Sequence, residues 1–119
     1  MAGYCDSDIV DCYSLCSAEG DNCVGGLIGY KAHRIYRCFS AGSVQGNSDT
    51  GGLVGRSWDS GLVDGFWDVE TSGQATSSRG GTGKTTAEMM QQSTFTNWDF
   101  TNTWDIVEGE TYPFFRPPQ

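Results

Sequence analysis

The stretch VGGLIG at residues 24–29 recurs as TGGLVG at residues 50–55, and this repetition decides the predicted fold. The triplet CYS at 12–14 likewise returns as CFS at 38–40, again 26 positions later. A repeat this short cannot bury its own apolar side, so successive copies must pack on one another with like positions aligned. The pattern therefore predicts that residues 26 apart lie side by side.

The aligned positions carry strand-forming residues, and the segments between them are rich in Gly, Asn, Asp and Ser, which is typical of turns. The sequence predicts an all-β fold, a parallel β-helix (β-solenoid) of about 26-residue coils with a C-terminal cap that contains one short helix. The coils span 11–36 and 37–63, with partial copies at 1–10 and 64–68, so residues 1–68 form the repeat region. The aligned residues are Ile9, Ile35 and Leu62; Tyr13, Phe39 and Phe66; and Leu27 and Leu53.

Six glycines mark the repeat and are interpreted as structural corners. Glycine tolerates positive φ and lets two backbone segments approach closely. Paired glycines would turn the chain into a strand whose apolar side chains fill the interior. They are Gly25, Gly26, Gly29, Gly51, Gly52 and Gly55.

The two copies resemble the GLUG motif, which occurs in large bacterial surface proteins, adhesin-like proteins and some secreted peptidases. The stretch GFWDVETSGQATSSRGGTGKTTAEM at 65–89, with TFTNWDF and EGETYPFFR after it, is similar to the segment that often closes such arrays. The resemblance covers about residues 9–119 and implies a β-solenoid in an exported protein, without a defined ligand. Cys16 and Cys23 depart from it, because small or polar residues are expected there.

Residues 69–119 are predicted to form a polar loop, a short helix and an aromatic cap. Thr85 and Glu88 fit a capping box that starts a helix at about 86–92. The aromatic residues that follow are expected to cover the open end of the last coil. Alternatively, Trp98 and Trp104 form an aromatic surface that binds carbohydrate.

The chain has five cysteines, which favours an oxidising compartment. Cys16 and Cys23 bracket a polar excursion, so a local disulfide is the first expectation. Cys12 and Cys38 share one ladder position on strands about 4.8 Å apart, where a disulfide or two buried thiols would both fit. Cys5 is then unpaired or linked elsewhere.

No catalytic, metal or cofactor site is expected. The GKT at 83–85 lacks the first glycine of a phosphate-binding loop, because Ser78 stands at that position, with four residues between it and the GK pair. His33 is the single histidine, which excludes a zinc HExxH motif and leaves no plausible His-centred triad. Asp6, Asp8 and Asp11 do not follow an EF-hand pattern and are interpreted as solvated charges.

The net charge of −8 argues against nucleic acid as a partner, and no apolar run is long enough for membrane insertion. The sequence favours a non-catalytic module of an exported or cell-surface protein, acting as an adhesive, a stalk or a self-associating structural unit. Its expected partners are another copy, stacked end to end, or a host or cell-surface glycan or protein. The alternative is an accessory domain of a secreted peptidase or polysaccharide-degrading enzyme.

Overall fold

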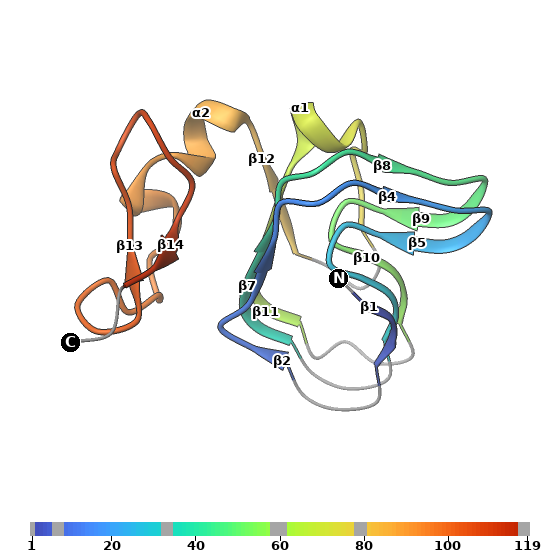
Figure 1. The fold of residues 1–119 in the computed structure, drawn as a ribbon, viewed down its shortest axis with the longest axis horizontal. Helices are drawn as coiled ribbons and strands as arrows, with labels where there is room; N and C mark the ends of the chain where they lie inside the picture. The colour runs from blue at the N-terminus through green and yellow to red at the C-terminus, as the bar shows by residue number, and fades with distance from the viewer. Residues whose placement is uncertain (1, 6–8, 32–34, 58–61, 78–80, 117–119) are drawn as a thin grey trace.

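Short strands follow one another along the first 68 residues of the computed structural model, which describes residues 2–5, 9–31, 35–57, 62–77 and 81–116 (Figure 1). In chain order they are β1 (Ala2–Cys5), β2 (Ile9–Val10), β3 (Tyr13–Ser14), β4 (Ala18–Glu19), β5 (Asn22–Gly25), β6 (Ile28–Lys31), β7 (Ile35–Ser40), β8 (Val44–Gln45), β9 (Ser48–Gly51), β10 (Val54–Ser57) and β11 (Leu62–Asp68). The rest comprises α1 (Val69–Ser72), β12 (Thr82–Lys84), α2 (Thr86–Met89), the 3₁₀ turn η1 (Gln92–Thr94), β13 (Trp104–Asp105) and β14 (Phe114–Phe115).

The predicted alignment of residues 26 apart is confirmed at the strands. Tyr13 pairs with Phe39 across the parallel strands β3 and β7. Leu27 donates its backbone N–H to the carbonyl of Leu53 at 3.0 Å. Ile28 in β6 lies between β1 and β10, which both run parallel to it. The repeat therefore sets the register between its copies.

The predicted fold class, a parallel β-helix, is contradicted. The chain is a small, mostly-β domain with several short parallel sheets: one follows the order β12-β11-β7-β2, and the β4–β8 and β5–β9 pairs contain only two strands each. Two complete copies of the repeat supply too few strands to build the long continuous sheets of a β-helix. After Asp68 the chain enters helix α1 instead of a further copy, and β13 and β14 later pair antiparallel.

An aliphatic core lies between the parallel sheets, and the repeat glycines allow its strands to approach closely. Leu27 and Leu53 are fully buried there. A Cβ atom on Gly26 would lie 2.4 Å from the carbonyl oxygen of Gly52, and one on Gly52 would lie 2.0 Å from Trp67 Cδ1. Real side chains do not tolerate such distances, so close packing requires glycine at both positions.

The left-handed backbone of the repeat falls on residues other than glycine. Asp11, Arg37 and Asp64 occupy one ladder position, with φ of 53°, 51° and 55°. Cys23 and Asp49 occupy another, with φ of 56° and 47°. Cys23 and Asp49 each lie two residues before a glycine pair, and the other three lie more than ten residues from one, contrary to the prediction that the paired glycines supply positive φ.

The C-terminal segment packs beside the sheet of β3, β7 and β11, on the side away from the aliphatic core (Figure 1). Tyr13 stacks on Phe39 with ring centroids 5.1 Å apart, and Phe66 meets Phe95 edge-on at 4.9 Å. The predicted capping box is confirmed: both its hydrogen bonds are present at α2, which ends at Met89. The aromatic residues therefore form a second core that joins the two parts of the chain.

Candidate functional site

The strand stack has two edges, and residues 71–77 and 81–84 close part of one of them. We call this the sealed edge, the outer side of β8, of Gly52–Val54 and of β11. The Thr71 hydroxyl donates to the carbonyl of Ala41 at 2.7 Å, and the Gln74 amide donates to that of Val44 at 3.0 Å. Strand β12 then pairs in parallel with β11.

The middle of the sealed edge is closed by a backbone carbonyl and a hydroxyl. Gly52 donates its N–H to the carbonyl of Thr76 at 2.9 Å. The Ser77 hydroxyl oxygen accepts from the N–H groups of Leu53 and Val54, at 3.2 and 2.7 Å. This segment was predicted to be only a polar loop. Asp68 before VETS and Gly73 after it were the overlooked signals, since they cap α1 at its two ends.

A buried carboxylate holds the sealing segment to the rest of the chain. Asp68 is fully buried and accepts hydrogen bonds from the hydroxyls of Thr86 and Tyr112, both at 2.7 Å, as well as from two backbone N–H groups of α1. Burial raises the pKa of Asp68, but these hydrogen bonds outweigh it and leave the pKa lowered. Burial together with the bond to Asp68 raises the pKa of Tyr112 to about 12. The Asp68 carboxylate therefore connects α1, α2 and the C-terminal segment through hydrogen bonds.

At the opposite end, β4 and β5 have a strand partner on one side only. Strand β4 pairs with β8 and β5 pairs with β9, and in the described part of the chain no strand lies beyond them. We call the outer side of residues 18–25 the open edge. An exposed strand edge presents N–H and C=O groups that can pair with another chain.

The open edge is acidic. Residues 10–25 contain three carboxylates and no lysine or arginine. Glu19 and Asp21 are both exposed, while Asp11 accepts a hydrogen bond from Arg37 Nε at 2.8 Å, which raises the pKa of Arg37. The residues paired with Glu19 and Asp21 in the second copy are neutral, Gln45 and Asn47.

Polar side chains of the second copy donate to their equivalents in the first. Asn47 Nδ2 donates to Asp21 Oδ1 at 2.7 Å, and the Ser48 hydroxyl donates to Asn22 Oδ1 at 3.0 Å. The pair of Arg37 and Asp11 follows the same pattern. In each pair, a donor of the second copy bonds an acceptor at the equivalent position of the first copy. This chemistry defines the kind of side chain that the open edge can accept.

The aromatic binding surface predicted at Trp98 and Trp104 is not present, because both indoles lie in the second core. Trp104 is fully buried and Trp98 is 6% exposed. Their ring centroids are 4.6 Å apart, and Trp104 Nε1 donates to Asp11 at 3.4 Å. Neither offers the free ring face on which a sugar could stack.

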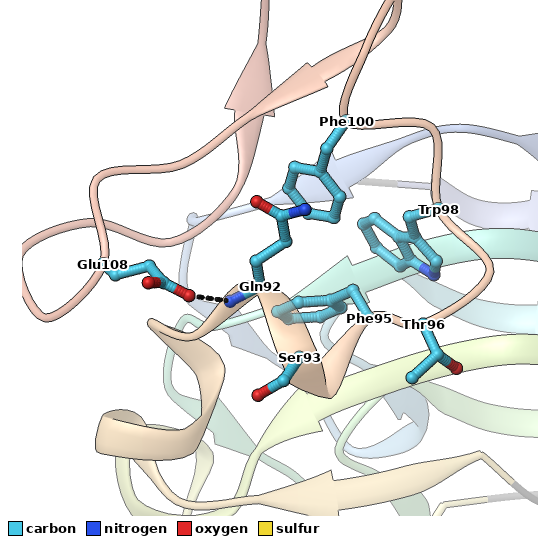
Figure 2. Close-up of a pocket in the computed structure, with 7 residues that line it drawn as sticks. All are labelled: Gln92, Ser93, Phe95, Thr96, Trp98, Phe100 and Glu108. Carbon is cyan, nitrogen blue, oxygen red and sulfur yellow. Dashed lines mark hydrogen bonds between the residues drawn. The ribbon is translucent and has the colours of Figure 1, made fainter.

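Trp98 also lines a surface pocket of about 430 Å³ (Figure 2). Phe95, which shares the lining, is only 1% exposed, so the pocket offers little aromatic surface. Glu108 accepts a hydrogen bond from the backbone N–H of Gln92 at 3.0 Å at its rim. Trp98 Nε1 is buried without a hydrogen-bond partner, and in Figure 2 it points toward Thr96 and away from Phe100 and Gln92. The pocket is therefore a poorer candidate than the open edge.

The structure contains neither predicted disulfide among Cys12, Cys16, Cys23 and Cys38. Cys12 and Cys38 are adjacent, as expected, but each donates its thiol to the carbonyl two residues earlier, at 3.3 and 3.2 Å. Burial raises the pKa of Cys38 to about 12 and raises that of Cys12. Cys23 directs its thiol at the Asn22 side chain.

The described residues hold no group of three or more His, Cys, Asp or Glu side chains placed to bind a metal. Thr85, at the end of the GKT stretch, caps α2. His33, Asp6 and Asp8 lie outside the described residues.

No family model matches the chain, and no curated protein or solved structure matches it either. The resemblance to the GLUG family therefore stays a prediction. None of the described helices is long and apolar enough to span a bilayer.

Proposed function

We propose that this chain is a non-catalytic module of an exported or cell-surface protein, and that it works as an adhesive, a stalk or a self-associating structural unit by pairing strands at its open edge. The contrast between the two edges carries the proposal: residues 71–77 and 81–84 bond one edge at β8, Gly52–Val54 and β11, whereas no described strand lies beyond β4 and β5 at the other. The acidic composition supports the extracellular setting.

Strand pairing at the open edge can be tested by self-association in high salt. In about 1 M NaCl the Debye length falls to roughly 3 Å, so repulsion between acidic edges is screened. We expect sedimentation velocity to show concentration-dependent dimers there. A wild-type chain that stays monomeric at every concentration would overturn self-association through the open edge.

A proline variant identifies the edge that pairs. The N–H groups of Ala18 and Gly20 donate to carbonyls on the β8 side, at 2.8 and 3.1 Å, so the N–H of Glu19 points outward. Glu19→Pro removes that outward donor and should abolish the dimer. Glu19→Ala keeps the N–H and should still associate. Equal association by both variants would show that another surface pairs.

A further inference from the structure

The two edges together restrict which partner the open edge can accept, an inference that rests on the proposed function. Thr71, Gln74, Thr76, Ser77 and β12 bond the far side of the stack at β8, Gly52–Val54 and β11. In the described part of the chain this leaves only β9 and β10 without a further strand partner there. The bonded segments oppose head-to-tail growth into a fibre, because a second copy cannot pair along the whole far side. Two copies that pair along the whole of residues 18–25 meet open edge to open edge.

Contact between two open edges brings like charges together. Each copy contributes the exposed Glu19 and Asp21, and residues 10–25 supply no basic side chain to offset them. Like charges on facing strands are destabilising. At physiological salt the chain is therefore a poor partner for itself.

Within the chain, the neighbour that the first copy does accept has different side chains at these positions. Gln45 lies beside Glu19, and Asn47 donates to Asp21 at 2.7 Å. We propose that the open edge binds one extended polypeptide strand that carries neutral or basic side chains next to Glu19 and Asp21, in preference to a second copy of this chain. One partner strand occupies the open edge.

Synthetic peptides test this preference directly. The neutral probe is the 38–51 sequence with Cys38→Ser, which contains Gln45 and Asn47. The acidic probe carries Gln45→Glu and Asn47→Asp in addition, which restores the charges of the first copy. Titration into isotopically labelled protein, followed by amide chemical shifts, should show the neutral probe binding about threefold to tenfold more tightly. The shifts should move at residues 18–22 and stay fixed at Gly52–Val54.

A charge exchange on the protein provides the matched control. Glu19→Lys should reverse the order, so that the acidic probe binds more tightly than the neutral one. Glu110→Lys makes the same charge change on an exposed turn outside the open edge and should leave the wild-type order unchanged. Thermal unfolding of each variant confirms that it is folded.

The outcomes separate this inference from the proposed function. If both probes bind equally and Glu19→Pro abolishes binding, the open edge pairs with strands but does not select by charge, and only the charge preference is wrong. If neither probe binds, or the shifts cluster at Gly52–Val54, docking at the open edge fails and the proposed function fails with it. Two probe strands per chain would contradict the sealed edge.

Discussion

The sealed and open edges of the strand stack differ in what pairs with their backbone N–H and C=O groups. Every short parallel sheet leaves N–H and C=O groups at its two sides. On the far side, α1, residues 74–77 and β12 return across β8, Gly52–Val54 and β11, and they bond these groups with side chains, a backbone carbonyl and a paired strand. On the near side, β4 and β5 carry no such cover in the described part of the chain, and their exposed side chains are acidic.

The two edges therefore differ in how easily a strand can be added. The whole of residues 18–25 is open to a partner strand, whereas the described far side leaves only β9 and β10 without a further strand partner. The acidic side chains at the open edge act as a second barrier, because they discourage pairing between identical copies. The largest expected effects therefore concern the groups that hold the sealed edge in place.

Asp68→Ala should have the largest effect, a loss of roughly 3 kcal/mol in the free energy of unfolding, because it leaves the hydroxyls of Thr86 and Tyr112 and two N–H groups without their acceptor. Urea unfolding measures this change. Tyr112→Phe removes only one of the donors and should cost about 1 kcal/mol. Equal losses in the two variants would show that the other hydrogen bonds to Asp68 add nothing to stability.

The same carboxylate makes stability depend on pH. Its pKa is lowered in the folded chain, so its contribution is complete above the unfolded value of about 4 and is lost as pH falls through the folded pKa. The Asp68→Ala variant lacks this contribution at every pH. The difference in stability between wild type and variant should therefore shrink in acid, and a difference that grew would contradict the assigned direction.

Gly52→Ala should destabilise the sealed edge by about 2 kcal/mol, because the new methyl group would force Trp67 to move. Trp67 Nε1 donates to the carbonyl of Gln74 at 2.8 Å, so its displacement loosens the sealing segment as well. Thermal unfolding measures the loss. Gly20→Ala at the open edge is the control: its Cβ would lie 3.2 Å from a Val24 methyl group, and the change should cost less than about 1 kcal/mol.

Ser77→Gly should convert part of the sealed edge into a second open edge. The change removes the acceptor for the N–H groups of Leu53 and Val54 and should cost about 1–2 kcal/mol. We expect oligomers larger than dimers in high salt, measured by sedimentation velocity. Ser93→Gly, at an exposed site outside the stack, should behave like wild type. A Ser77→Gly chain that forms dimers alone would mean that other contacts suffice to seal the edge.

The sequence predicts the register between the two copies correctly, but it does not predict how the sealed edge is bonded. Repetition of GGL at 25–27 and 51–53 is a direct signal, since like residues must align if short copies are to share a core. The number of copies is too small to fix the architecture, so the β-helix prediction failed where α1 begins. The sequence left open whether Trp98 and Trp104 belong to the expected aromatic cap or to an exposed binding surface, because exposed and buried aromatic clusters look alike in sequence. The seal depends on side chains such as Ser77 meeting backbone 23 and 24 residues away, for which no local pattern exists.

The smallest effect is expected at the corner where the two copies differ in sequence but share a backbone. Cys23 has φ of 56° and its equivalent Asp49 has φ of 47°. Asparagine and aspartate tolerate this left-handed conformation better than other side chains with a Cβ atom. Cys23→Asn should therefore stabilise the chain by about 0.5 kcal/mol, measured by urea unfolding. Cys23→Ala removes the thiol without relieving the backbone and should give no gain; an equal gain in both variants would assign the effect to the thiol instead of to φ.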